Sequence, residues 1–253
     1  MDLGLRDRVY LVTGGTRGLG FATATALVED GAKVVVTGRD EKRAEEAAAA
    51  LGGHDHALGV GADNSDSGTA ERLVASALAR FGRLDGALVS VGGPPAGAIT
   101  AVDDDQWRDA FESVFLGAVR LARATAAALA GGGSIGFVLS SSVRQPIGGL
   151  GISNGLRPGL AMVAKTLADE LGPHGIRVFG LLPGRIDTDR IRDLDGLTAD
   201  PDDTRARHAE SIPLARYGTP EEFGRVAAFT LSPAASYLTG LMIPVDGGLM
   251  RSL

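Results

Sequence analysis

Short apolar runs alternate with longer helix-favouring stretches along most of the chain. The apolar runs, which predict buried strands, lie at 9–12, 33–37, 58–60, 86–90, 134–139, 176–182 and 242–245. The stretches that predict helices lie at 19–30, 41–51, 66–81, 103–129 and 220–231, with a further helix that ends near residue 171. Strands that are apolar on both faces and alternate with helices form parallel sheets covered on each side. The pattern therefore predicts an α/β fold: a single Rossmann-type domain over residues 1–253, with a doubly wound parallel sheet and helices on both faces.

The regular alternation breaks between Asp187 and Arg216. This segment is polar, contains the run Asp200-Pro201-Asp202-Asp203, and is long for a connection between two elements. Loops of that length in a compact domain are usually active-site lids or disordered segments. We expect a substrate lid at about 187–216.

A second irregularity is Pro158, which interrupts a segment of helical composition. Proline donates no backbone N–H and clashes with the preceding turn of a helix. We therefore expect the helix either to begin late, with Ser153 or Asn154 as its cap, or to kink. In either case Ser153 and Arg157 need not share one helix face.

Composition narrows the class of function. The 253 residues are 44% hydrophobic with a net charge of −6, which fits a globular protein and argues against a dedicated binder of nucleic acid or anionic membranes. No run approaches the roughly 20 apolar residues of a membrane span. The first residues lack a secretion signal, and cysteine is absent, so we expect a cytoplasmic protein without disulfides or thiolate chemistry. The pair His54 and His56 is too weak a pattern to predict a metal site.

The glycine-rich segment 13–20 follows the first predicted strand directly and opens the first helix. Glycines in that position permit a tight turn and let backbone N–H groups and the helix N-terminus face a pyrophosphate. The candidate cofactor-binding residues of this loop are Gly14, Thr16, Arg17, Gly18, Leu19 and Gly20. The segment therefore predicts a dinucleotide site.

The end of the second predicted strand distinguishes NAD from NADP. An acidic residue there would bind the adenosine ribose and repel a 2′-phosphate, but Gly38 stands in that place. Arg17 and Arg39 offer two cations to a phosphate, and Thr16 offers a hydroxyl. The sequence predicts NADP(H), with the alternative that Arg39 is a solvated turn residue and Asp40 a helix cap.

Several motifs in a fixed order resemble the short-chain dehydrogenase/reductase family, of the 3-oxoacyl-ACP-reductase type. Segment 13–20 is similar to the family's TGxxxGxG pattern, segment 182–188 to its PGxIxT segment for the nicotinamide carboxamide, and segment 245–248 to a C-terminal signature. The resemblance implies further cofactor contacts from Asp63, Asn64, Ser90, Gly92, Pro183, Gly184, Ile186 and Thr188. It also implies a small-molecule substrate and a homo-oligomer, a tetramer or dimer, with contacts through 237–245 and the long helices.

The catalytic residues depart from the family's Asn, Ser, Tyr and Lys. Ser140 aligns with the serine, but Ser153 stands in the place of the tyrosine and Arg157 in that of the lysine. The asparagine would fall near Ser113 or Val114. None of the three tyrosines has a lysine four residues later, so the usual pair is absent from the chain.

Ser140, Ser153 and Arg157 are the candidate catalytic residues. Serine is too weak an acid for the tyrosine's role, and arginine stays protonated, although it can donate hydrogen bonds to an oxyanion or a carboxylate. Ser140 has the alternative role of satisfying a turn. We expect an NADP(H)-dependent oxidoreductase acting on a carbonyl or alcohol through an altered site. A non-redox lyase, isomerase or cyclase on the same fold, and a catalytically silent NADP-binding protein, are the alternatives.

Overall fold

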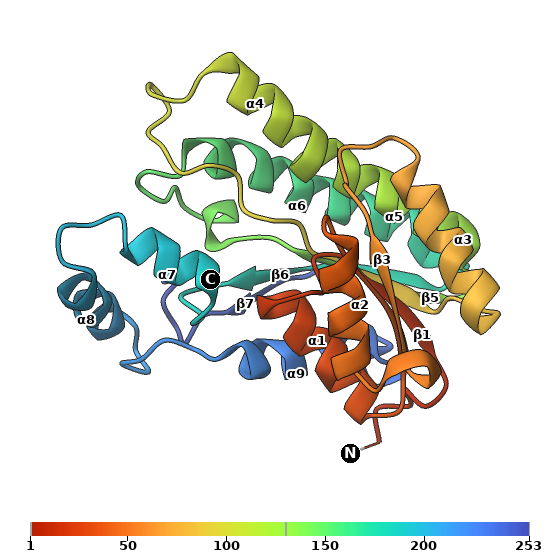
Figure 1. Ribbon diagram of the computed structural model, residues 1–253. Helices are drawn as coiled ribbons and strands as arrows, with labels where there is room; N and C mark the ends of the chain where they lie inside the picture. Colours follow the sequence, from red (N-terminus) through yellow and green to blue (C-terminus); the bar gives the residue numbers. More distant parts are fainter. Residues whose placement is uncertain (1, 130, 253) are drawn as a thin grey trace.

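The computed structural model describes residues 2–129 and 131–252, and over these residues seven strands form one parallel sheet (Figure 1). The strands are β1 (Val9–Val12), β2 (Lys33–Gly38), β3 (Ala57–Gly61), β4 (Gly86–Val89), β5 (Gly133–Val138), β6 (Ile176–Pro183) and β7 (Met242–Val245). Their order across the sheet is β3-β2-β1-β4-β5-β6-β7. The chain reverses its direction of winding between β1 and β4, which creates a topological switch point at their carboxyl ends. The predicted fold class is confirmed.

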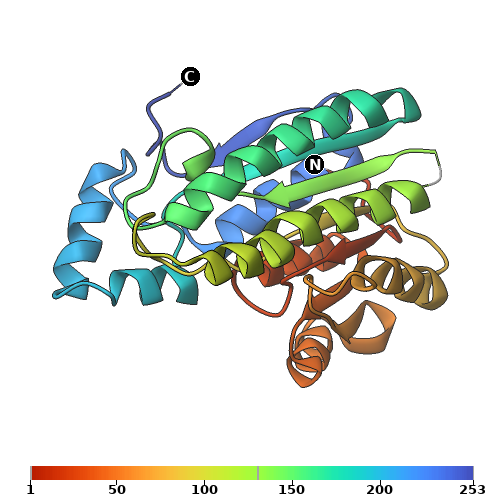
Figure 2. The same ribbon diagram turned by 90° about the horizontal axis from the view of Figure 1, so that it is seen from above.

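Helices cover both faces of the sheet because successive strand residues point to opposite sides. Tyr10 packs in the core under one group of helices: α1 (Gly18–Glu29), α2 (Glu41–Ala50) and α9 (Pro220–Leu231). Leu11 packs in the core under the other: α3 (Thr69–Phe81), α5 (Gly117–Ala128) and α6 (Gly151–Leu171). Figure 2 shows α5 and α6 running side by side over the sheet. None of the described helices is both long and apolar enough to cross a membrane.

Most of the predicted elements match the structure to within one residue, but two helices differ. The helix expected over 66–81 begins at Thr69. The helix expected over 103–129 is divided into α4 (Asp104–Ala110), a π-helical turn over Phe111–Leu116, and α5. A π-helical turn carries an extra residue per turn, and such turns are frequent at functional sites.

The segment at 187–216 is helical rather than irregular. It folds into α7 (Asp189–Asp195) and α8 (Pro201–Ser211), which lie beyond the carboxyl ends of β5 and β6 (Figures 1 and 2). Asp200 accepts a hydrogen bond from Asp203 N (3.0 Å), and Pro201 occupies the first helical position. An acidic cap followed by proline is a helix-start pattern, so the polar run begins a helix instead of forming a loop.

The expectation of a late start for α6 is wrong. The helix begins at Gly151 and runs without interruption through Pro158. Two flanking glycines explain this by their close packing: a Cβ at Gly155 would lie 2.6 Å from the Trp107 ring, and one at Gly159 would lie 2.9 Å from the Phe115 ring. Packing against these two rings offsets the helix penalty of proline, which is of the order of 3 kcal/mol.

Candidate cofactor and active site

The glycine loop is locked to the end of β4 at the switch point. Thr13 Oγ1 donates a hydrogen bond to Ser90 O (2.8 Å) and accepts one from Ser90 N (2.9 Å). Gly14 has a φ of +56°, and a Cβ there would lie 2.7 Å from Ser90 O. A Cβ at Gly20 would collide with Gly14 O. These positions require glycine because the turn closes on itself and on β4.

The glycine loop faces the segment that follows β6. A Cβ on Gly18 would lie 3.5 Å from Thr188 Cγ2, and Arg17 pairs with Asp189 at 3.6 Å. Both charged side chains of that pair are exposed, so it contributes little stability. The two segments predicted to hold the pyrophosphate and the nicotinamide, 13–20 and 183–188, are therefore neighbours at one edge of the sheet.

The end of β2 leaves little room for an acidic side chain. A Cβ at Gly38 would lie 2.7 Å from Thr16 Cγ2, so any larger residue would displace Thr16. Arg39 is exposed, and no acidic side chain of the described residues forms an ion pair with it. Asp40 accepts a hydrogen bond from Arg43 N (3.1 Å) and caps α2, as the alternative interpretation of this residue proposed.

Asp63 and Asn64 lie in the turn after β3. Asp63 Oδ1 accepts hydrogen bonds from Ser65 N (2.9 Å) and Ser65 Oγ (2.7 Å), which lower the pKa of this carboxyl, with a smaller contribution from Arg39. The Asn64 backbone packs so closely against Gly117 that a Cβ at Gly117 would collide with it. Arg39, Asp63 and Asn64 thus lie at neighbouring strand ends, β2 and β3, which pair in the sheet.

The serine cluster follows β5. Ser140 Oγ accepts a hydrogen bond from Ser142 N (3.1 Å) and caps a short turn over Ser141–Val143, so its turn-satisfying role is present. Ser142 Oγ and Ser153 Oγ are 3.4 Å apart, and both side chains are buried. The structure therefore joins Ser153 of α6 to the segment at the end of β5.

Arg157 is a buried cation that forms no ion pair with any acidic side chain of the described residues. Its Nη1 donates to Val138 O (2.7 Å) and its Nη2 to Val91 O (3.4 Å), while its Nε has no hydrogen-bond partner among the described residues. Burial, and to a lesser degree Arg190, lowers the pKa of this guanidinium to about 10. Ser153 and Arg157 both reach the end of β5, so they share one face of α6, contrary to expectation.

Arg190 of α7 binds the same loop as Arg157. Its Nη2 donates to Pro94 O (2.7 Å), and a Cβ on Gly93 would lie 2.8 Å from its Nε. Burial lowers the pKa of Arg190, an effect that Asp193 partly opposes. Two guanidinium groups therefore hold the segment Val91–Pro94, which follows β4 and contains the candidate residue Gly92.

The candidates for the family's asparagine do not reach this site. Val114 is buried in the core, and Ser113 Oγ donates to the backbone oxygen of Asp109 (2.7 Å). Both residues lie in the π-helical turn that divides the long helix.

A buried polar network beside β6 gave no recognisable pattern in the sequence. Arg185 Nη1 donates to Asp195 Oδ1 (2.7 Å), and Tyr217 OH donates to Asp195 Oδ2 (2.9 Å). His208 lies between them, with Nε2 at 3.0 Å from Arg185 Nη2 and Nδ1 at 3.3 Å from the Tyr217 hydroxyl. Burial and the hydrogen bond to Asp195 raise the pKa of Tyr217 to about 12. Burial, then Arg185, lowers the pKa of His208, with Asp195 opposing.

These four residues, Arg185, Asp195, His208 and Tyr217, are called the lid network below. They come from α7, α8 and the segments that flank them, which are far apart in the sequence. No helical or strand periodicity in the sequence could have predicted that these four side chains meet. The network ties α7 and α8 to the segment directly after Pro183 and Gly184.

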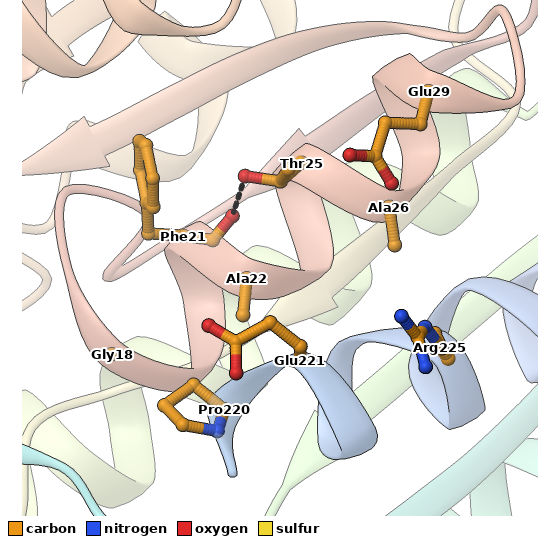
Figure 3. Close-up of a pocket in the computed structure, with 9 residues that line it drawn as sticks. All are labelled: Gly18, Phe21, Ala22, Thr25, Ala26, Glu29, Pro220, Glu221 and Arg225. Carbon is orange, nitrogen blue, oxygen red and sulfur yellow. Dashed lines mark hydrogen bonds between the residues drawn. The ribbon is translucent and has the colours of Figure 1, made fainter.

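A surface pocket of about 340 Å³ lies away from these groups, between α1 and α9 (Figure 3). Its lining consists of Gly18, Phe21, Ala22, Thr25, Ala26, Glu29, Pro220, Glu221 and Arg225. Gly18 is the only lining residue that the sequence singled out, and the pocket contains none of the candidate catalytic side chains. Among the described residues no three His, Asp or Glu side chains gather as a metal site would require, and His54 instead contacts Arg80 Nη2 (2.6 Å).

The parallel sheet and the glycine turn at its switch point define a Rossmann-type α/β protein. The sequence family described as enoyl-(acyl carrier protein) reductase matches residues 14–250. L-rhamnose 1-dehydrogenase (NAD(P)(+)) of Azotobacter vinelandii is 34% identical over 98% of this chain and 99% of its own. 3-Oxoacyl-[acyl-carrier-protein] reductase FabG of Salmonella typhimurium is 31% identical over 98% of this chain and 99% of its own.

A solved structure supports the same family assignment. L-sorbose reductase of Gluconobacter frateurii, crystallised with NADPH and L-sorbose, matches with a TM-score of 0.94 and 31% identity over 100% of both chains. The chain belongs to the short-chain dehydrogenase/reductase family of NAD(P)-dependent oxidoreductases.

Proposed function

We propose that the protein is an NADP(H)-dependent oxidoreductase that acts on a carbonyl or alcohol through an altered active site. The observation that carries this proposal is the neighbourhood of Gly18 and Thr188, which brings the phosphate loop and the nicotinamide segment to the edge where Ser153 and Arg157 also lie. A protein that only bound the adenine half of a dinucleotide would not need the second segment.

The choice of NADP(H) over NAD(H) is supported by the end of β2. Gly38 packs on Thr16, and Arg39 is exposed without an ion pair in the described parts of the chain. A phosphate group would supply the missing anion through charge-assisted hydrogen bonds. L-sorbose reductase, which shares the fold over its full length, was crystallised with NADPH.

The roles proposed for the catalytic residues follow from their chemistry. The bound nicotinamide would supply or accept the hydride. Ser153 and Ser142 form a pair of hydroxyl groups that can orient a substrate oxygen, and the buried charge of Arg157 stabilises negative charge developing on that oxygen. Because neither serine nor arginine releases a proton readily near neutral pH, the proton comes from water or from the substrate itself.

Oxidation of NADPH in the presence of reactive carbonyl compounds tests this proposal. The wild type should oxidise NADPH, slowly with generic ketones. Ser153→Tyr combined with Arg157→Lys should raise generic ketone reduction by about 10²–10⁴, the usual contribution of acid–base catalysis. Each single substitution should give much less, since the tyrosine and the lysine act as one unit. No turnover by wild type or by the double variant would favour a non-redox lyase, isomerase or cyclase, or a silent NADP-binding protein.

We also propose a homo-oligomer, a tetramer or dimer. Tyr237 is fully exposed, and Met162 of α6 is 66% exposed, so large apolar side chains project from two of the surfaces predicted to form contacts. A partner copy would remove them from water. Light scattering at micromolar concentration should give a mass well above the 25.9 kDa of one chain.

A further inference from the structure

The charge of Arg157 has no counter-charge. The side chain is 5% exposed, its two hydrogen bonds go to backbone carbonyls, and Nε has no partner. Within the described residues it forms no ion pair, and the one charge that shifts the pKa of Arg157 is a second cation, Arg190. Burying an ion without a counter-ion is strongly unfavourable, and backbone carbonyls supply only part of the lost solvation.

Arg190 brings a second positive charge to the same loop. It too forms no ion pair within the described residues, although Asp193 opposes the effect of burial on its pKa. Arg157 binds Val91 O and Arg190 binds Pro94 O, and these carbonyl groups belong to residues three apart. The two carbonyls therefore lie within about 11 Å of each other. The charge of Arg190 also lowers the pKa of Arg157, so the two cations repel one another, and a bound anion would offset this repulsion.

The loop between the two guanidinium groups is open. Gly92 and Gly93 are exposed, and a Cβ on Gly92 would meet no atom within 4 Å, whereas Arg190 already lies against Gly93. A small charged group can therefore approach the backbone here. Arginine recognises planar anions through two parallel N–H donors, which suits a carboxylate.

Building on the proposed function, we propose that the substrate is a small oxo or hydroxy acid whose carboxylate binds between Arg190 and Arg157. Arg190, which is half-buried at the lid, contacts the carboxylate directly. Arg157 adds its buried positive charge from behind the loop. A carboxylate in this place also offsets the repulsion between the two cations.

The test measures anion binding to the full-length protein by calorimetry, without any redox reaction. Oxalate serves as the carboxylate probe, oxamide as its neutral counterpart of similar shape, and inorganic phosphate as a competing anion. Oxalate should bind at least tenfold more tightly than oxamide and more tightly than phosphate. Arg190→Gln should weaken oxalate binding at least tenfold, which corresponds to about 1.4 kcal/mol.

Arg225→Gln provides the matched control, because Arg225 is an exposed arginine on α9 away from the loop. This variant should bind oxalate like the wild type. Equal binding of oxalate and oxamide, or an equal loss in the two variants, would overturn the proposal. Tighter binding of phosphate than of oxalate would overturn the assignment of a carboxylate. NADPH calorimetry on the same samples tests the proposed function separately, since cofactor binding can fail while oxalate still binds.

Discussion

Two arginines in different regions of the molecule, the partly buried Arg185 and the buried Arg157, have opposite electrostatic surroundings. In the lid network, Arg185 binds a buried aspartate, Asp195, which also accepts a hydrogen bond from Tyr217. At the carboxyl edge of β4 and β5, Arg157 is buried more deeply and meets only backbone carbonyls. Each region holds a guanidinium group that is largely removed from water, but only the first supplies a carboxylate.

The presence or absence of a carboxylate partner indicates a structural role for Arg185 and a binding role for Arg157. Removing one partner of a buried ion pair leaves the other charge unsatisfied and costs about 3–5 kcal/mol, so the lid network holds its helices in place. A buried cation without a counter-ion destabilises the fold and gains its partner only when an anion binds. Four predictions examine this contrast, from the largest expected effect to the smallest.

Asp195→Ala should lower the free energy of unfolding by about 3 kcal/mol, because Arg185 and the Tyr217 hydroxyl both lose their acceptor. Urea unfolding measures this loss. Asp193→Ala is the control, since Asp193 is an exposed acid on the same helix, and it should change stability by less than about 0.5 kcal/mol. Equal effects of the two substitutions would show that the lid network does not stabilise the protein.

Arg39→Asp extends the contrast to an exposed arginine without an ion pair. It should weaken NADPH binding by about tenfold to a hundredfold, the range expected for lost hydrogen bonds to a charged group, and should leave NADH binding nearly unchanged. Calorimetry with both cofactors measures the ratio. Arg225→Asp makes the same change of charge on α9 and should not alter it. Wild-type protein that binds the two cofactors equally would contradict the assignment of NADP(H).

Arg157→Met should change the free energy of unfolding by less than about 1.5 kcal/mol. The substitution removes two hydrogen bonds, but it also removes the cost of burying an unpaired charge, and an apolar replacement of a buried ion is often neutral. Urea unfolding measures this change, and the result is compared with that of Asp195→Ala. A loss as large as that of Asp195→Ala would mean that Arg157 is mainly a structural residue.

The lid network should also make stability depend on pH through His208. The pKa of His208 is lowered in the folded state, chiefly by burial, so the unfolded chain binds more protons as the pH falls below about 6.5. The stabilising contribution is complete above that pH and is lost as the pH falls through the folded-state pKa. Unfolding curves between pH 7.5 and 5.5 should show this loss, and His208→Gln should reduce it. An unchanged slope in the variant would assign the pH dependence to other groups.

The sequence by itself determined the order of elements and the position of the glycine loop at the switch point of the sheet. Apolar runs and helical patterns, glycines after the first strand, and a cap such as Asp40 are local signals, and local signals depend on few neighbours. The resemblance to the family also predicts that Ser153 and Arg157 stand in the places of its tyrosine and lysine, and this replacement stays a prediction. The individual cofactor contacts and catalytic roles remain predictions.

Tertiary structure decided what local rules could not. Pro158 stays inside α6 because glycines on that helix pack against Trp107 and Phe115, which outweighs the local preference of proline. The burial of Arg157 and the influence of Arg190 on it depend on where α6, the ends of β4 and β5, and α7 meet. The lid network joins residues from separate segments, and no periodic pattern encodes such a meeting. Burial and charge pairing are properties of the whole fold, so the tertiary structure determines them and the local sequence does not.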